Sequence, residues 1–246
     1  MSELQGKNAF VSGGSKGIGA AIALKLAEVG ANVAITYSKS ETEAARVVQE
    51  IEAKGVKGLA IQADAIEAEN VIKAVQKTAA TLGNIDILVN NAGIVKLKSI
   101  TESTLEDFDC ITNVNVKAVF AATMEAVKSM PSGGRIITIG SVNGDFIPFP
   151  GGSLYAMSKA AVQMMTKGWA RDLGERQITA NIIQPGPIDT DMNPADGEFA
   201  DRGKAITAIK RYGKPEEVAE LAVFLASPRA SNITGAAINI DGGFTI

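Results

Sequence analysis

The sequence contains no histidine and a single cysteine, Cys110, among its 246 residues. Without histidine, a Ser-His-Asp triad cannot form, and zinc sites built from cysteine and histidine are excluded, so we expect no metal. One cysteine cannot form an internal disulfide, and nothing marks an oxidising compartment. We interpret Cys110 as a half-buried thiol on a helix, because no histidine is available to activate it as a nucleophile.

Long apolar runs and excess basic charge are also absent. No uninterrupted apolar run reaches the length of about 18 residues that a membrane-spanning helix needs. The N-terminal stretch MSELQGKNAF lacks the basic-then-apolar order of a signal peptide. The net charge of -3 creates no general field that attracts nucleic acid or an anionic membrane. The sequence therefore predicts a cytoplasmic protein that binds neither nucleic acid nor a membrane.

The chain alternates β-branched apolar runs with longer stretches of helical period, a pattern typical of βα units that build a parallel sheet. The predicted strands are 8–13, 32–38, 58–64, 85–93, 135–141, 179–186 and 236–243. The predicted helices lie near 17–30, 41–54, 67–82, 105–129, 153–173 and 215–226. We expect an α/β fold over residues 1–246 as one domain: a Rossmann-type doubly wound parallel sheet of about seven strands flanked by helices.

A glycine-rich turn follows the first predicted strand. In VSGGSKGIGAAIA, the glycines Gly13, Gly17 and Gly19 are spaced G-x-x-x-G-x-G ahead of a helix of small residues. Glycine permits a sharp turn and a close approach of the backbone to a pyrophosphate, and the helix N-terminus offers free N–H groups to it. A purely structural turn is the alternative. The position between a strand and a helix favours a dinucleotide site.

The end of the second predicted strand indicates which dinucleotide is preferred. An NAD-specific protein typically carries an acid there for the ribose 2′-hydroxyl. This chain instead has Tyr37, Ser38 and Lys39, and Lys16 projects from the glycine turn. Two lysines without a carboxylate suit a 2′-phosphate, so NADP(H) is favoured. Two solvated surface lysines are the alternative, which leaves NAD(H) possible.

The segment SLYAMSKA places Tyr155 and Lys159 four residues apart, on one face of a predicted helix. This spacing alone is common on protein surfaces. Here it is accompanied by Ser141 at the end of the fifth predicted strand and by Asn115 on the preceding long helix. An ammonium group beside a phenol favours the phenolate, so we expect Lys159 to lower the pKa of Tyr155 toward neutrality.

Six motifs together resemble the classical short-chain dehydrogenase/reductase family over essentially the whole chain. They are SGGSKGIG at 12–19, NNAG at 90–93, GSV at 140–142, YAMSK at 155–159, PGPIDT at 185–190 and DGG at 241–243. By this resemblance, the residues that match the family's catalytic tetrad are Asn115, Ser141, Tyr155 and Lys159. The resemblance implies that Tyr155 protonates the developing alkoxide while hydride arrives from the nicotinamide, and that Ser141 hydrogen-bonds the same oxygen. It further implies that Lys159 holds the nicotinamide ribose and that Asn115 fixes a relay water.

The same resemblance implies a set of cofactor contacts. In chain order they are Gly13, Ser15, Lys16, Gly17, Ile18, Gly19, Tyr37, Ser38, Lys39, Asp64, Ala65, Asn91, Ala92, Gly93, Tyr155, Lys159, Pro185, Gly186, Ile188 and Thr190. Asp64 and Ala65 would contact adenine, residues 91–93 would line the adenine ribose, and Ile188 with Thr190 would reach the carboxamide and phosphates. Asp64 could instead cap a helix, and the PGP sequence could merely shape a turn.

Two segments are expected to surround the substrate, a small-molecule carbonyl compound or alcohol. The stretch 143–152, with Phe146, Ile147 and Phe149, would form an apolar wall or else pack against a neighbouring subunit. The polar stretch 187–210 follows the sixth strand and is predicted to be a lid, because open α/β sheets bind ligands at that edge. Glu198, Asp201 and Arg202 would add polarity to it.

Within the family the sequence looks most similar to 3-oxoacyl-(acyl-carrier-protein) reductases and related carbonyl reductases. Basic residues that would dock an acidic carrier look depleted, since only Lys128 and Arg176 remain near the ends of the two long helices. We therefore favour a small-molecule carbonyl reductase. The carrier-dependent enzyme and a non-catalytic NADP-binding regulator are the alternatives. The resemblance also implies a homotetramer built on helices 105–129 and 153–173.

Overall fold

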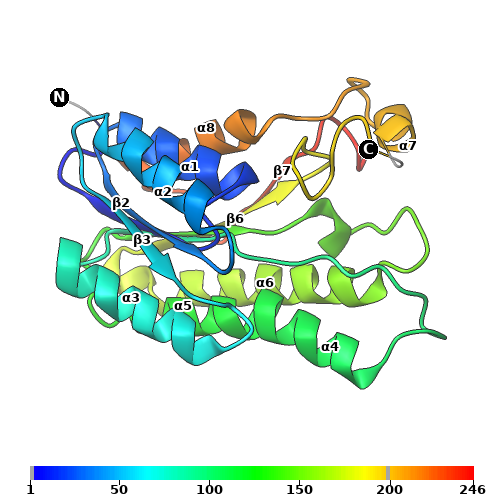
Figure 1. The fold of residues 1–246 in the computed structure, drawn as a ribbon, viewed down its shortest axis with the longest axis horizontal. Helices are drawn as coiled ribbons and strands as arrows, with labels where there is room; N and C mark the ends of the chain where they lie inside the picture. The colour runs from blue at the N-terminus through cyan, green and yellow to red at the C-terminus, as the bar shows by residue number, and fades with distance from the viewer. Residues whose placement is uncertain (1–2, 198–199) are drawn as a thin grey trace.

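The protein folds around one parallel sheet, as the computed structural model of residues 3–197 and 200–246 shows (Figure 1). The strands are β1 (Asn8–Val11), β2 (Asn32–Tyr37), β3 (Gly58–Gln62), β4 (Ile87–Asn90), β5 (Arg135–Ile139), β6 (Thr179–Pro185) and β7 (Ala237–Ile240). They lie in the order β3-β2-β1-β4-β5-β6-β7. The strand order reverses direction between β1 and β4, which makes the sheet doubly wound, with a crevice at the carboxyl ends of these two strands.

Helices cover both faces of the sheet. The α-helices are α1 (Gly17–Glu28), α2 (Glu41–Glu52), α3 (Ala68–Leu82), α4 (Leu105–Thr112), α5 (Ala118–Ala126), α6 (Ser153–Asp172), α7 (Ala200–Ile206) and α8 (Pro215–Ala226). In Figure 1, α1, α2 and α8 lie on one face, and α3, α5 and α6 lie on the other. The expected Rossmann-type α/β fold is confirmed.

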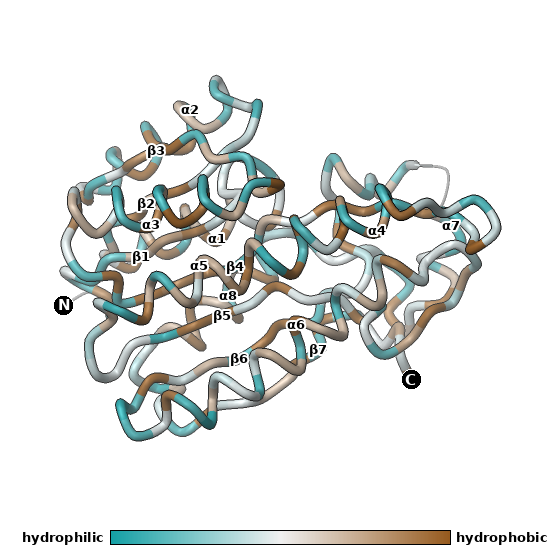
Figure 2. Tube along the Cα trace, turned by 90° about the horizontal axis from the view of Figure 1, so that it is seen from below, coloured by the Kyte–Doolittle hydropathy of each residue, from teal (hydrophilic) through white to brown (hydrophobic). Residues whose placement is uncertain are grey.

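Each strand contributes to two hydrophobic cores because successive side chains point to opposite faces. In β1, Ala9 and Val11 pack toward α1 and α8, whereas Phe10 packs toward α3 and α5. In β5, Ile137 packs toward α1 and α8, and Ile136 packs toward α3 and α5. Figure 2 shows β5 in the hydrophobic colour, whereas hydrophobic and hydrophilic colours alternate along the helices. Burial on both faces thus explains the near-continuous apolar character of the strands.

The prediction of one regular helix over 105–129 is wrong. It consists of α4, one π-helical turn over Asn113–Lys117, and α5. Thr104 begins α4 with a capping box, since its side chain accepts a hydrogen bond from the Asp107 N–H and the Asp107 carboxylate accepts one from the Thr104 N–H. The π turn carries Asn115, and such turns often occur at functional sites.

The predicted strands extend too far at their carboxyl ends. The strand predicted over 85–93 forms only Ile87–Asn90, because the N–H groups of Asn91 and Ala92 donate to the Ser12 hydroxyl at 3.0 and 3.1 Å rather than continuing the ladder. The chain therefore leaves the sheet where the crevice opens. The segment predicted as a lid, 187–210, is mostly loop and includes α7, and Glu198 within it lies outside the described residues.

Candidate active site

The glycine turn lies at the crevice and is fixed by close backbone packing. Gly17 has a φ of 54°, a left-handed conformation that favours glycine. A Cβ on Gly19 would overlap the Gly13 carbonyl and the Asn91 side-chain amide. That amide donates to the carbonyl oxygens of Ser12 and Gly13 at 3.0 and 2.9 Å. Asn91 therefore ties the turn to β4, and the spacing of the glycines reflects contacts that no larger residue permits.

The first turn of α1 is open to an anion. Lys16 precedes the helix without a side-chain cap from the described residues, and the first helical turn contains no acid. Free N–H groups and the positive end of the helix dipole therefore face the crevice. The methyl group of Thr190 lies 3.3 Å from the position that a Cβ on Gly17 would occupy. The predicted phosphate contacts Gly17, Ile18, Gly19 and Thr190 thus come together, and the chemistry of this cradle fits a pyrophosphate.

The region expected to receive a 2′-phosphate contains acids that the sequence analysis did not anticipate. The Lys16 ammonium lies 2.9 Å from Glu43 and 3.8 Å from Asp191. The hydrogen bond and charge of Glu43 raise the pKa of Lys16. Ser38 and Lys39 are exposed beyond β2, where the Ser38 carbonyl accepts a hydrogen bond from Gln62. The expectation of two lysines without a carboxylate is wrong for Lys16, because α2 brings Glu43 to it.

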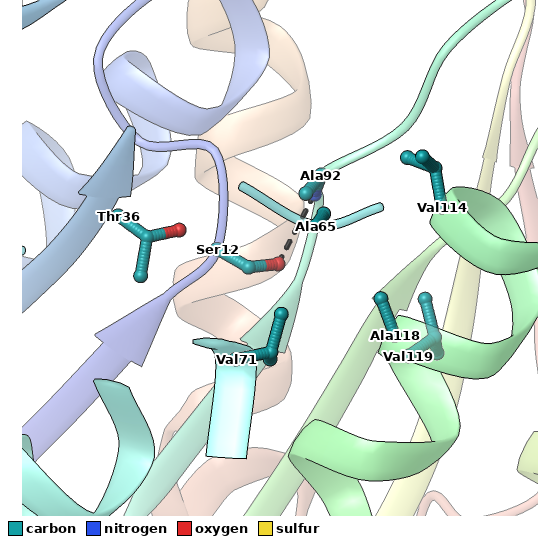
Figure 3. Close-up of a pocket in the computed structure, with 8 residues that line it drawn as sticks. All are labelled: Ser12, Thr36, Ala65, Val71, Ala92, Val114, Ala118 and Val119. Atoms are coloured by element: carbon teal, nitrogen blue, oxygen red, sulfur yellow. Dashed lines mark hydrogen bonds between the residues drawn. The ribbon is translucent and has the colours of Figure 1, made fainter. Parts of the chain in front are cut away.

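A small pocket lies beside the glycine turn (Figure 3). Its lining residues come from the carboxyl ends of the strands and from α3, the π turn and α5: Ser12, Thr36, Ala65, Val71, Ala92, Val114, Ala118 and Val119. Figure 3 shows the Ser12 hydroxyl hydrogen-bonded to Ala92 N. Predicted contacts Ala65 and Ala92 thus meet in one pocket. Asp64 is exposed, and its carboxylate accepts a hydrogen bond from the Ile66 N–H at 3.1 Å, so a turn-forming role is present alongside any contact with adenine.

Three of the four predicted catalytic residues meet at the carboxyl end of β5. Ser141 follows the strand directly, and its hydroxyl accepts a hydrogen bond from the Asn143 N–H at 3.1 Å. Lys159 on α6 donates to the Ile139 carbonyl at 2.9 Å, and its Nζ lies 5.7 Å from the centroid of the Tyr155 ring. The Ser141 side chain is close enough to the Tyr155 phenol to lower its pKa. A hydroxyl, a phenol and an ammonium thus face one space.

Asn115 is buried and reaches this group from the π turn. Its side-chain amide donates to the carbonyl of Ile94 at 2.9 Å and to the Ser158 hydroxyl at 3.0 Å. Gly93 lies between Asn115 and Lys159, because a Cβ there would be 3.4 Å from Asn115 Oδ1 and 3.5 Å from Lys159 Nζ. The whole tetrad is therefore brought together, and the Asn115 amide already has partners within the chain.

We expected Lys159 to lower the pKa of Tyr155, and this expectation is wrong, because the pKa is raised. Burial raises the pKa of Tyr155, and the hydrogen bond from Ser141 offsets this only in part. Burial lowers the pKa of Lys159 to about 8. The Lys159 ammonium donates to the Ile139 carbonyl and lies over the Tyr155 ring. Burial is thus the largest influence on the pKa of both groups.

The segment 143–152, predicted to form an apolar wall or to pack against a neighbouring subunit, presents apolar side chains at its surface. Phe146 and Ile147 are 44% and 48% exposed. Phe146 also makes an edge-to-face contact with Phe244, with ring centroids 6.1 Å apart. The wall is attached to the loop after β4, since the Lys98 N–H donates to the Gly151 carbonyl at 3.0 Å. A hydrophobic surface therefore borders the reacting groups.

The lid segment lies against this wall and against the sheet. The Arg202 guanidinium is 3.4 Å from the Pro148 carbonyl, and Asp201 is exposed. At the base of the lid, buried Ile188 forms a bridge with Gly213. The Gly186 N–H donates to the Ile240 carbonyl at 3.1 Å, which fixes the Pro185-Gly186 turn beside β7. The predicted contacts Pro185, Gly186 and Ile188 thus define the base of the lid.

Two residues near the site were not singled out in the sequence. Glu43 was missed because only the packing of α2 brings it to the glycine turn. Gln184 was missed although it directly follows the apolar pair Ile182 and Ile183 and is fully buried in β6. A glutamine at the carboxyl end of a buried strand is the signal that could have identified it.

Within residues 3–197 and 200–246, no group of three or more potential metal-binding side chains is present. The same residues include no helix with the length and apolar character needed to cross a bilayer. Cys110 is free and half-buried on α4, which confirms that part of its interpretation.

Comparison with known proteins places these features in context. A model of the family described as enoyl-(acyl carrier protein) reductase matches residues 13–245. A cyclic-di-GMP-binding biofilm dispersal mediator protein of Escherichia coli (strain K12) is 46% identical over 244 residues, 99% of each chain. A 3-oxoacyl-(acyl-carrier-protein) reductase of Staphylococcus aureus (strain Mu50) is 39% identical over 240 residues, 96% of this chain and 97% of that protein.

Among solved structures, a short-chain dehydrogenase from Burkholderia cenocepacia J2315 in complex with NADP has the same fold. It is 50% identical in sequence and superposes with a TM-score of 0.98, covering 99% of this chain and 100% of that chain. The similarity thus extends over the full sheet and both layers of helices.

Proposed function

Because the chain belongs to the short-chain dehydrogenase/reductase family of oxidoreductases, we propose that it is an NADP(H)-dependent carbonyl reductase, which reduces a small-molecule ketone or aldehyde to an alcohol and catalyses the reverse reaction. The observation that carries this proposal is the convergence of Ser141, Tyr155 and Lys159 at the crevice opposite an open, glycine-lined helix N-terminus. We treat residues 1–246 as one NAD(P)-binding domain.

In the proposed mechanism, bound NADPH supplies the hydride. The Ser141 hydroxyl donates a hydrogen bond to the substrate carbonyl oxygen and orients it. The Tyr155 phenol gives its proton to the same oxygen as negative charge develops there. The Lys159 ammonium, whose pKa is lowered to about 8, remains largely protonated at neutral pH and stabilises the phenolate that results. The apolar wall at 143–152 excludes water from the reacting carbonyl.

The preference for NADP(H) rests on two supports. The B. cenocepacia dehydrogenase, 50% identical to this chain, was solved with NADP. In addition, Lys16 and Lys39 occupy the region where a 2′-phosphate would bind, and the first turn of α1 carries no acid. NAD(H) remains the second cofactor to test, because Glu43 already pairs with Lys16.

The proposed substrate is a free carbonyl compound rather than one attached to an acyl carrier protein. Arg176 donates to the carbonyl oxygens of Val127 and Met130 at the end of α5, and Lys128 pairs with Glu125. Both basic residues that could dock an acidic carrier are thus engaged within the chain. The exposed aromatic and aliphatic side chains of Phe146 and Ile147 favour an apolar ketone.

The test measures NADPH and NADH oxidation by the purified protein with linear, cyclic, aromatic and 3-oxoacyl ketones, alongside Tyr155→Phe. We expect turnover with NADPH, and loss of turnover in Tyr155→Phe with unchanged NADPH binding. Cyclic di-GMP is added to one series, because the E. coli relative is named for binding it. Binding of NADPH without oxidation of any ketone would instead favour the non-catalytic NADP-binding regulator. Selective turnover of the carrier-linked 3-oxoacyl substrate would favour the fatty-acid-synthesis enzyme.

We also propose a cytoplasmic homotetramer. Large apolar side chains are exposed on the outer faces of α4, α5 and α6: Leu105, Phe108, Phe120, Met124 and Met164. Such a surface is typical of an interface between subunits. Sedimentation velocity with Phe120→Glu tests the assembly, which should dissociate when charge is placed on this surface. Cell fractionation tests the location.

A further inference from the structure

We propose that Gln184 is a positioning residue for Ser141. Its buried side chain fixes the serine turn, which comprises residues 141–144 after β5, to helix α6. This inference rests on the proposed function, because it assigns to Gln184 an effect on the proposed carbonyl reduction. Gln184 accepts a hydrogen bond from the backbone N–H of Ser141 and so positions the Ser141 hydroxyl. Gln184 itself does not contact the reacting atoms.

The hydrogen bonds of Gln184 define its orientation. Gln184 is fully buried in β6, and its Oε1 accepts a hydrogen bond from the backbone N–H of Ser141 at 2.7 Å. Since a backbone N–H only donates, the oxygen of the amide must point toward Ser141. Its Nε2 then donates to the side-chain oxygen of Gln163, Oε1, at 2.8 Å, and Asp145 Oδ2 lies farther away at 3.5 Å. One side chain therefore satisfies polar groups on two other elements.

The position of Gln184 explains a glycine in the serine motif. A Cβ on Gly140 would overlap the Gln184 carbonyl oxygen and would lie 2.8 Å from the Ile182 side chain. Gly140 is not among the residues with positive φ. Space for the glutamine, rather than an unusual backbone conformation, thus requires glycine immediately before Ser141.

Gln163 connects this arrangement to the catalytic helix. It lies one turn after Lys159 on α6 and is 9% exposed. Next to it, Gly144 packs so closely on α6 that an added Cβ would lie 3.1 Å from Ala160 N and 3.2 Å from the Lys159 carbonyl carbon. The serine turn thus touches α6 directly and is also joined to it through Gln184. The distance between the Ser141 hydroxyl and the Tyr155 phenol depends on this joint.

The consequence is catalytic because both hydroxyl groups act on one oxygen atom. Without the glutamine, the Ser141 N–H is buried without a partner and the turn must move to find one. A displacement of about 1 Å in reacting groups costs on the order of 10²-fold in rate. The affinity for NADPH should change much less than kcat, since the glycine turn and α1, which would hold the pyrophosphate, lie on the other side of the crevice.

The experiment compares Gln184→Met with Gln184→Glu. Gln184→Met removes the acceptor, and we expect kcat to fall on the order of 10²-fold with a much smaller change in the KM for NADPH. Gln184→Glu, when protonated, keeps both an acceptor for Ser141 and a donor for Gln163. Because burial raises the pKa of a carboxyl group, this variant should retain activity at about pH 6 and lose it as the pH rises, unlike the wild type.

Asn181→Leu is the matched control. Asn181 is also a buried amide of β6, and it bonds the Ile233 carbonyl and the Ala236 N–H. Its loss should lower stability and leave kcat unchanged. A parallel fall of kcat in Gln184→Met and Asn181→Leu, or a wild-type pH profile in Gln184→Glu, would overturn the proposal.

Hydrogen exchange at the Ser141 amide separates this inference from the proposed function. The amide should be protected in the wild type and in Gln184→Glu, and should exchange faster in Gln184→Met. If the wild type turns over no ketone, the proposed function fails, and this exchange still decides whether Gln184 fixes the serine turn. Equal protection in all three proteins would show that it does not.

Discussion

The Asn115 side chain bonds both main-chain polar groups of Ile94: Oδ1 accepts from the Ile94 N–H at 2.8 Å, and Nδ2 donates to the Ile94 carbonyl at 2.9 Å. Ile94 lies in the loop that closes β4, directly after Gly93, which separates Asn115 from Lys159. A single side chain therefore fixes the loop beside Lys159. Asn115 reaches Ile94 from the π turn at Asn113–Lys117.

Replacing this side chain tests its contribution to the fold. Asn115→Leu leaves the N–H and carbonyl of Ile94 without these partners, and we expect a loss of about 2 kcal/mol in the free energy of unfolding. Urea denaturation measures the loss. Asn113→Leu, in the same π turn, is the control, because the structure gives the Asn113 side chain no hydrogen bond among the described residues. An equal loss in both variants would show that the turn, and not the Ile94 contact, is responsible.

The buried ammonium of Lys159 predicts a stability that rises in alkaline solution. Burial lowers the pKa of Lys159 from 10.5 to about 8. Between these values the unfolded chain binds more protons than the native one, so the cost of burying the charge is full below about pH 8 and is relieved toward pH 10.5.

We therefore expect wild type to gain about 2 kcal/mol relative to Lys159→Met between pH 7 and pH 10. Urea unfolding at closely spaced pH values measures the difference. Lys167→Met, which removes an exposed lysine from the same helix, serves as the control. A constant difference between wild type and Lys159→Met across this range would contradict the lowered pKa.

The ion pair between Lys16 and Glu43 predicts the direction of a cofactor effect. Glu43→Gln releases Lys16 for a 2′-phosphate, so the Kd for NADPH should fall by roughly threefold and the Kd for NADH should not change. Fluorescence titration measures both constants, and high salt should reduce the gain. Glu41→Gln, which removes an exposed acid two residues earlier on α2, is the control. Equal tightening for both cofactors would rule out a role in selecting the phosphate.

The contact between Gly140 and Gln184 predicts non-additive mutations. Gly140→Ala forces the added methyl group into the Gln184 amide and should cost about 2 kcal/mol of stability. In Gln184→Ala the same change should cost much less, because the overlapping oxygen is gone. A double-mutant cycle by urea unfolding measures the coupling. Gly168→Ala is the control, since within the described chain its added carbon meets nothing within 4 Å apart from its two neighbouring residues and the nearby backbone of its own helix. Additive costs would count against the overlap.

Much of the architecture could be predicted because the alternation of buried strands and amphipathic helices is local in sequence. The helix predicted over 215–226 agrees with α8, and all seven strands were located. The end of β4 could not be predicted, because the N–H groups of Asn91 and Ala92 donate to the Ser12 hydroxyl, which is far away in sequence. The π turn at 113–117 was missed since the apolar period continues through it.

The site could be predicted where a motif stands in one segment, and could not where packing joins distant segments. The glycine turn and the pair Tyr155 and Lys159 are of the first kind. Asn115 and Ser141 stand in two other segments, and the resemblance to a family, rather than one local motif, joined them to this pair. Glu43 beside Lys16 and Gln184 beneath Ser141 are of the second kind, because each pair joins two different elements. The pKa of Tyr155 was misjudged for a related reason: burial of the phenol, which the spacing does not reveal, raises this pKa.

The contact between Phe146 and Phe244 has a practical consequence for work with the purified protein. Phe244 lies two residues before Ile246, which is 99% exposed, and the C mark stands near α7 in Figure 1. If the proposed function holds, an affinity tag or fused domain attached after Ile246 would emerge near the proposed substrate entrance. Attachment at the other end of the chain, or removal of a C-terminal tag before kinetic assays, keeps the entrance unobstructed.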